Sequence, residues 1–105
     1  MSLEFTAELT ADDLLILEQH RLERLRSFFG ETLRLCFIYL DKKNTLAIHC
    51  SEPWIVDQLL NEMNELRWYS WMVVGASQIS ICFAQEEIHK TKTRKPGKKS
   101  LRVHT

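Results

Sequence analysis

The sequence predicts a single two-layer α+β domain followed by a basic C-terminal tail. Two segments place apolar residues at helical spacing behind helix-start signals, and three shorter segments are rich in β-branched, aromatic and leucine residues. The predicted order is α-β-β-α-β. Both helices are expected on one face of a three-stranded sheet, because two layers then share one core.

The first helix is predicted from Thr10 to about Phe29. Thr10 can cap the helix, Asp13 occupies the third helical position of a capping box, and Gly30 is a typical stop residue. The apolar residues that follow recur along one stripe, which we expect to face the core. This stripe contains Leu14, Leu17, Leu25 and Phe28, and is widened by Leu22 and Phe29.

A β-hairpin is predicted at residues 33–40 and 45–50, around a turn at residues 41–44. Period-two patterning puts Leu33, Leu35, Phe37 and Tyr39 on one face of the first strand and Leu46, Ile48 and Cys50 on one face of the second. The other face of the first strand is apolar as well. We expect Ile38 and Leu40 there to be covered by the N-terminal segment or by another subunit.

A second helix is predicted to begin at Ser51, which can act as its cap, and Pro53 fits the first turn, where an N–H is not needed. Apolar residues recur at helical spacing as far as Leu66. One long helix ending at Gly75 fits the pattern, and so does a break near Tyr69 that makes two helices.

The third strand is predicted at residues 78–84, where Ile79, Ile81 and Phe83 alternate with polar residues. The domain is therefore predicted at residues 1–88. Residues 89–105 have no apolar periodicity and their like charges repel, so we expect them to be disordered when free.

Charge is distributed unevenly along the chain. Residues 89–105 carry seven bases and no acid, whereas residues 1–88 carry seven bases and fourteen carboxylates, so the net charge of zero divides into +7 and −7. A basic segment of this kind can contact phosphates in a salt-sensitive, sequence-independent way. Because the tail has no aromatic residue, stacking on bases is not available within it, and any specificity would have to come from the body. The predicted nucleic-acid contacts are Lys90, Lys92, Arg94, Lys95, Lys98, Lys99 and Arg102.

Four large aromatic residues follow the hairpin, and such residues are frequent at protein-binding hot spots. We expect Trp54 and Trp71 to belong to the core or its edge. Adjacent helical positions cannot all face one core, so a protein-interaction or homodimer surface is predicted from the remaining two and the apolar face of the first strand. Its residues are Trp68, Tyr69, Ile38 and Leu40.

The sequence contains no arrangement typical of catalysis or metal binding. Cys36, Cys50 and Cys82 are odd in number, widely spaced and set in apolar stretches, which favours buried, inert thiols in a reducing compartment. His49 and Cys50 are strand neighbours that point to opposite faces, and no glycine-rich phosphate loop is present. We therefore expect no enzymatic activity, no cofactor and no metal site.

The N-terminal residues are acidic where a signal peptide is basic, and no apolar run reaches the ~20 residues that a membrane helix needs. A cytoplasmic protein without membrane contact is predicted.

From Thr10 to Glu87 the predicted order is similar to that of the type II KH domain and of the N-terminal domain of the bacterial replication initiator. The local resemblance lies in residues 44–60, where a strand, a short polar turn, the aromatic Trp54 and an amphipathic helix follow one another. The resemblance implies a KH-like domain and, in the initiator-type version, a module that recruits replication partners. KH domains clamp nucleic acid with a GXXG loop, which is absent here because the only glycines are Gly30, Gly75 and Gly97.

The sequence thus favours a non-enzymatic, nucleic-acid-associated module in replication or RNA transactions, with a body that binds a protein partner and a tail that contacts phosphates. The alternative is a protein adaptor or regulator whose tail docks on acidic protein surfaces, without nucleic acid. A tail that only improves solubility is a third interpretation. The sequence leaves open the choice between DNA and RNA, the partner and the oligomeric state.

Overall fold

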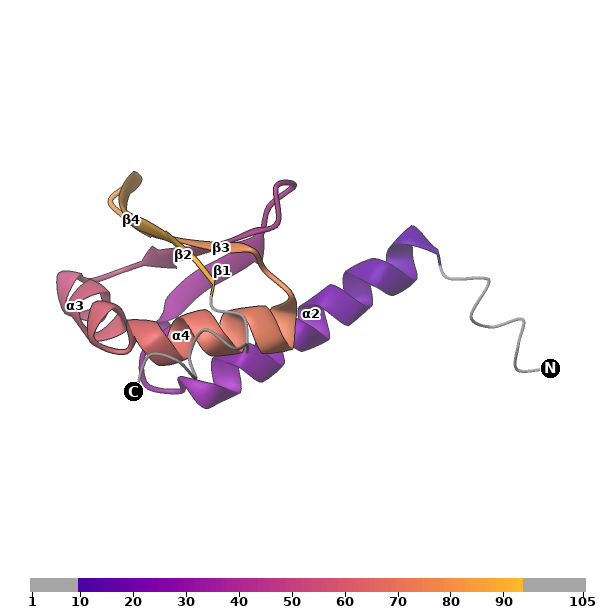
Figure 1. Ribbon diagram of the computed structural model, residues 1–105, viewed down its shortest axis with the longest axis horizontal. Helices are drawn as coiled ribbons and strands as arrows, with labels where there is room; N and C mark the ends of the chain where they lie inside the picture. Colours follow the sequence, from indigo (N-terminus) through magenta and orange to yellow (C-terminus); the bar gives the residue numbers. More distant parts are fainter. Residues whose placement is uncertain (1–9, 94–105) are drawn as a thin grey trace, which may run out of the picture.

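The structure, a computed structural model, describes residues 10–93 and has an α+β fold (Figure 1). Four strands form one mixed sheet in the order β1-β2-β3-β4. The outer pairs are antiparallel, and the central pair, β2 and β3, is parallel. The elements are α2 (Ala11–Phe28), η1 (Leu33–Leu35), β1 (Cys36–Leu40), β2 (Thr45–Cys50), α3 (Pro53–Asn61), α4 (Met63–Tyr69), η2 (Ser70–Val74), β3 (Gln78–Phe83) and β4 (Glu86–Lys92).

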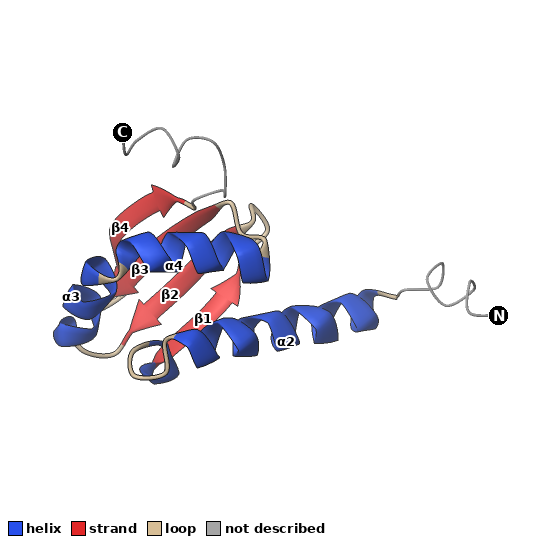
Figure 2. Cartoon of the chain, turned by 60° about the horizontal axis from the view of Figure 1, so that its bottom comes forward, coloured by secondary structure: helices blue, strands red, loops and turns tan. Residues whose placement is uncertain are grey.

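The helices lie on one face of the sheet (Figure 2), and no helix of residues 10–93 covers the opposite face (Figure 1). The segment α3-α4-η2 connects the parallel strands β2 and β3 and packs with part of α2 against the covered face. The core between the two layers is apolar, and its fully buried members come from both layers. These are Leu25, Leu33, Leu46, Ile48, Ile55, Leu59, Leu66, Ile79 and Ile81.

Helix α2 begins with the predicted capping box. The Asp13 amide donates to Thr10 Oγ1 at 3.1 Å, and the Thr10 amide donates to Asp13 Oδ2 at 3.0 Å. The predicted core stripe is only partly correct, because the first half of α2 extends beyond the rest of the domain (Figure 1), and because Phe28, the last residue of the helix, lies off the buried stripe. Leu22, Leu25 and Phe29 are buried, whereas three predicted core residues are exposed, namely Leu14, Leu17 and Phe28.

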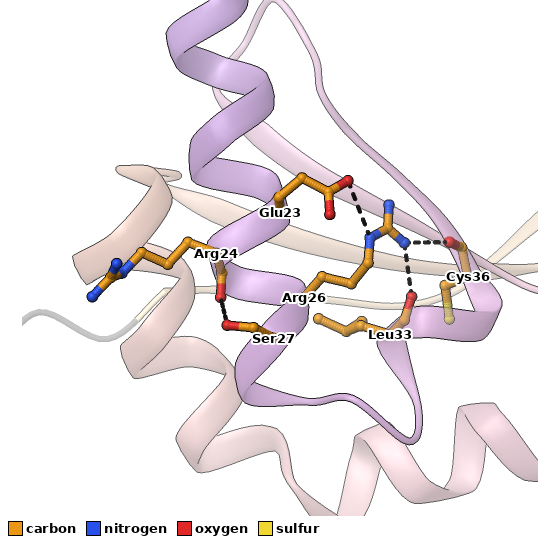
Figure 3. A network of polar contacts seen from close by, with 6 residues as sticks. All are labelled: Glu23, Arg24, Arg26, Ser27, Leu33 and Cys36. Carbon is orange, nitrogen blue, oxygen red and sulfur yellow. Dashed lines mark hydrogen bonds and ion pairs between the residues drawn. The ribbon is translucent and has the colours of Figure 1, made fainter.

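Arg26 ties the end of α2 to the start of the sheet (Figure 3). Its Nη1 donates to the carbonyl oxygens of Leu33 and Cys36, each at 3.0 Å. Its Nε lies 3.9 Å from Glu23 Oε2 on the preceding helical turn. One guanidinium thus holds α2, η1 and the first residue of β1 together.

Phe37 and Tyr39 share one face of β1 as predicted, but this face points away from the core, and residues 33–35, predicted as strand, form η1. The hairpin turn has three residues, not four, because Asp41 still pairs with Thr45 and donates its amide to the Thr45 carbonyl at 2.9 Å. Asn44 adopts a left-handed conformation with φ 64°, and Asp41 Oδ1 accepts from the amides of Lys43 and Thr45. A one-residue change of register reverses the face of every side chain. Ile38 therefore pairs with Ile48 in the core, and Phe37 points outward.

The second helical segment breaks at Glu62, between α3 and α4, which the sequence does not predict, and α4 ends at Tyr69, near the predicted break. Beyond Tyr69 the chain continues as the π-helical turn η2. Gly75 ends it in the left-handed region with φ 81°, and its amide donates to the carbonyls of Ser70 and Trp71. Pro53 opens α3 as predicted, but the cap position is Glu52, not Ser51.

The sheet has four strands where the sequence predicts three. Strand β4 pairs with β3 through a two-residue turn in which Ala84 and Gln85 both have positive φ, 56° and 67°. Neither residue is a usual turn residue, and β4 is charged and exposed, as an edge strand can be. Residues 89–92, which the sequence places in the tail, belong to this strand.

Candidate nucleic-acid interface

The open side of the sheet, named here the outer face, is built by every second residue of each strand. Strand pairing arranges these residues in three rows across the sheet. One row crosses all four strands from Tyr39 through Ala47 and Ser80 to Lys90. The flanking rows are Phe37, His49, Cys82 and Glu87 on one side, and Thr45, Gln78 and Lys92 on the other.

Three rings cluster at the β1 edge of the outer face. The Tyr39 and His49 rings are stacked, with centroids 5.6 Å apart and an interplanar angle of 11°. The Phe37 ring centroid lies 5.5 Å from that of Tyr39 and 6.2 Å from that of His49, and both ring pairs are tilted. Phe37 is 66% exposed and Tyr39 39% exposed, which is unusual for a pair of large aromatic residues. The cluster therefore offers ring surface to a ligand.

Two lysines lie at the opposite edge. Lys90 and Lys92 project from the exposed strand β4 and belong to the predicted set of phosphate contacts. Because adjacent strands are about 4.8 Å apart, the β1 and β4 edges are separated by roughly 14 Å. The residues between these edges are mostly small and poorly exposed: Thr45, Ala47 and Ser80 are buried, and Cys82 is half-buried. The outer face thus presents rings along one edge and cations along the other, with little accessible surface between them.

One end of the outer face is basic. The Thr93 amide donates to the Ser77 carbonyl at 3.0 Å, and the Ser77 amide donates to the Asn44 carbonyl at 2.8 Å. These bonds bring the end of β4 beside the β1–β2 turn, which carries Lys42 and Lys43. Thr93, the last described residue, therefore lies at the basic end of the sheet. The remaining predicted phosphate contacts lie outside the described residues: Arg94, Lys95, Lys98, Lys99 and Arg102.

The other end of the outer face is acidic. Glu86 and Glu87 follow the β3–β4 turn, and Glu52 follows the end of β2. The Glu87 carboxylate accepts one hydrogen bond within the sheet, since Ser80 Oγ donates to Glu87 Oε2 at 2.6 Å. A polyanion on the outer face is therefore favoured at the end that carries the β1–β2 turn and disfavoured at the end that carries the β3–β4 turn.

The structure does not gather the four predicted protein-interaction residues on one surface. Ile38 is only 5% exposed, and Leu40 packs against the same core from the covered side of the sheet. Tyr69 stacks on Phe28, with ring centroids 4.6 Å apart, and Trp68 is half-buried on α4. The register of the hairpin separates the strand residues from the helix residues, so a surface that uses Ile38 is incompatible with this fold.

Of the two other tryptophans, Trp54 is exposed and Trp71 is only half-buried. Trp54 follows Pro53 at the start of α3 and is 51% exposed, contrary to its predicted core position. The two residues after it, Ile55 and Val56, fill the core positions of that helical turn. Trp71 is half-buried in η2.

Cys36 and Cys50 are buried as predicted, and Cys82 is half-buried on the outer face. The Cys36 and Cys50 sulfur atoms lie 4.0 Å apart on paired residues. Burial, reinforced by the Cys50 thiol, raises the pKa of Cys36 to about 12, and burial also raises the pKa of Cys50. Both thiols therefore stay protonated and poorly nucleophilic at neutral pH.

No cluster of His, Cys, Asp and Glu in residues 10–93 could hold a metal ion. In the same part of the chain, no helix combines the length and the apolar character needed to cross a membrane.

The sequence does not identify Phe37, Tyr39 and His49 as candidate site residues. The sequence does contain information that could identify them. With a three-residue turn that ends at Asn44, even-numbered residues of β1 pair with even-numbered residues of β2, so Ile38 pairs with Ile48. That match puts an aliphatic set on the core face and leaves the rings and the histidine together outside. Comparison of the chain with protein-family models, curated proteins and solved structures finds no match.

Proposed function

We propose that this protein is a cytoplasmic module that binds single-stranded nucleic acid on the outer face of its sheet, with residues 94–105 extending the phosphate contacts. The observation that carries the proposal is the row from Tyr39 to Lys90, which puts exposed rings and a cation on opposite edges of one open face. Binding of single strands commonly combines a basic track for the backbone with aromatic side chains on which bases stack.

The dimensions of the outer face support this ligand. The roughly 14 Å between the two edges matches about two nucleotides of an extended strand, so one base can stack at Tyr39 while a following phosphate reaches Lys90. A duplex hides its base faces, so it can use the cations but not the rings. The proposal therefore favours single strands over duplexes, and it leaves the choice between DNA and RNA to experiment.

KH domains bind nucleic acid at a different place in the fold, the junction of the paired helices. With the helix break included, the chain has the order α-β-β-α-α-β-β, and the junction of the paired helices is Glu62. In a KH domain this junction carries the GXXG loop that clamps phosphates. A carboxylate there repels a phosphate, so the outer face is the better candidate for nucleic acid. If the fold is KH-like, it uses another surface for binding.

The test is a titration of fluorescently labelled single-stranded and duplex DNA and RNA with the full chain, over a salt series. We expect single strands to bind more tightly, with affinity that falls as salt rises. Replacement of Lys90 and Lys92 by Gln should reduce the slope of log affinity against log salt by about 0.7 for each lost contact to a single strand. Arg34→Gln is a matched control, because Arg34 is exposed in η1 at the far end of β1.

Absence of binding to every nucleic acid at low salt would exclude this function. That result would turn attention to the protein adaptor whose basic tail docks on acidic protein surfaces. Binding that is unchanged by the two lysine replacements, but lost when the five bases in residues 94–105 are replaced by Gln, would assign all phosphate contacts to the tail and remove the outer face from the proposal.

A further inference from the structure

The first half of helix α2 has no partner within residues 10–93 of its own chain, although it is strongly apolar. Leu14, Leu15, Ile16 and Leu17 are 53%, 55%, 56% and 42% exposed. Four consecutive residues at 100° intervals cover nearly the whole circumference of a helix. A helix that is apolar on all sides is normally buried. This projecting segment, residues 14–17, is therefore suited to contact with another surface.

A groove of complementary character lies further along the same helix, where α2 meets η2. It encloses about 420 Å³. Phe28, Met72 and Val73 provide apolar lining, and Arg21 and Arg24 provide positive charge. Neither arginine forms an ion pair within the described residues, where the single ion pair joins Glu23 and Arg26. The complete lining is His20, Arg21, Arg24, Phe28, Met72 and Val73.

The projecting segment carries the charges that this groove lacks. Asp12 and Asp13 precede it and Glu18 follows it directly, so an apolar segment is bracketed by acids. The groove presents an apolar lining with bases. The segment and the groove lie on one continuous helix, about eight residues or ~12 Å apart along its axis. They cannot meet within a single chain, because a rigid helix cannot fold onto itself.

We propose that two copies of this chain form a two-fold dimer in which their α2 helices pack antiparallel and each projecting segment fills the α2/η2 groove of the other copy. In this arrangement Ile16 lies beside Arg24 of the second copy, and Glu18 lies between Arg21 and Arg24 of the second copy. A two-fold axis forms both contacts at once, which is the property of an isologous interface. The axis crosses α2 near His20.

The dimer is independent of the nucleic-acid proposal, since α2 and η2 lie on the covered side of the sheet (Figure 2) and a contact between them does not use the outer face. It would place two outer faces in one particle. The affinity of the dimer and the affinity for nucleic acid are separate measurements, so failure of one proposal does not decide the other.

The test measures the mass of the full chain by sedimentation velocity over a concentration series. We expect a monomer–dimer equilibrium. Leu17→Glu should raise the dissociation constant at least tenfold, because it puts a charge on an apolar contact. Leu60→Glu is the matched control, since Leu60 is 38% exposed on α3 and lies outside the groove. Circular dichroism confirms that each variant keeps its helices.

Charge exchange gives the decisive result. Glu18→Arg and Arg24→Glu should each weaken the homodimer at least tenfold, because each brings like charges together twice. An equimolar mixture of the two variants should dimerise again, since both contacts across the axis then join opposite charges. A wild-type chain that stays monomeric at all concentrations would overturn the proposal. A dimer that resists Leu17→Glu, or a mixture that stays monomeric, would overturn it as well.

Discussion

Tyr39 and Lys90 lie at opposite ends of a single row of paired residues that crosses all four strands. Their connection runs through Ala47 and Ser80, which are small residues and each only 7% exposed. The row joins a ring on β1 to a cation on β4 although fifty residues of sequence lie between them. The row results from the order and register of the strands, and neither can be read from a short stretch of the sequence.

Removing the rings should weaken binding of single strands specifically. Phe37→Ala and Tyr39→Ala are each expected to reduce single-strand affinity by about 5- to 160-fold, since stacking contributes about 1–3 kcal/mol per base. Duplex affinity should stay nearly constant, because a duplex does not expose base faces. Fluorescence anisotropy with labelled oligonucleotides measures both affinities. Trp54→Ala is the control, because Trp54 is exposed on α3 and not on the sheet. Equal losses for single strands and duplexes would contradict the stacking role.

The β3–β4 turn should be improved by conventional turn residues. Ala84 and Gln85 both hold positive φ, which side chains with a Cβ adopt at a cost. The double replacement Ala84→Asn and Gln85→Gly should raise the free energy of unfolding by about 1–2 kcal/mol. Urea unfolding measures this change. Gly75→Ala should lower the free energy of unfolding, because Gly75 has φ 81°, which a residue with a Cβ adopts at a cost. A stability loss in the turn variant would show that the turn is not of this type.

Loss of the Arg26 guanidinium should destabilise the domain. Arg26→Ala removes two hydrogen bonds to backbone carbonyls and is expected to lower the free energy of unfolding by about 2–3 kcal/mol. Arg26→Lys should restore part of the lost free energy of unfolding, since an ammonium keeps the charge of the guanidinium but not its planar arrangement of donors. Arg34→Ala is the matched control and should change stability by less than about 0.5 kcal/mol. Similar losses at both positions would argue against a specific clamp.

Alkaline pH should destabilise the fold through Cys36. Burial raises the pKa of this thiol from 9.0 to about 12. Between these values the folded chain keeps a proton that the unfolded chain has released, so the free energy of unfolding falls as the pH rises through this window. Cys36→Ala removes the contribution and should make the alkaline decrease shallower. Urea unfolding at several pH values from 9.0 to about 12 measures the difference. Parallel pH profiles for both chains would contradict this effect, and Cys82→Ala, on the outer face, serves as the control.

The α+β class and most elements are predictable because they depend on local signals. The Thr10 cap, Pro53 at a helix start and Gly75 at a helix end all act within a few residues of where they stand. The faces of β1 are not predictable in this way. They depend on whether the turn before Thr45 has three or four residues, and the difference lies in the conformation of Asn44.

Strand β4 is missed for a different physical reason. Its turn, Ala84-Gln85, lacks the residues that tolerate positive φ, and its exposed residues show no apolar alternation. The bulge between Ile81 and Cys82 further disturbs the period of two. Lys90 and Lys92 are predicted as phosphate contacts from their charge alone, and their place opposite the rings depends on a strand that composition does not indicate. The site is therefore less predictable than the fold.

The parallel pairing of β2 and β3 has a consequence for the order of folding events. The rings belong to the β1–β2 hairpin and the lysines to the β3–β4 hairpin, and either hairpin can form locally. The two hairpins come together only when the long crossover through α3, α4 and η2 closes, which is a slow, non-local step. The complete outer face therefore exists only in the complete fold. Any ligand that spans both edges will stabilise the native chain by mass action and give no such stabilisation to a partly folded intermediate.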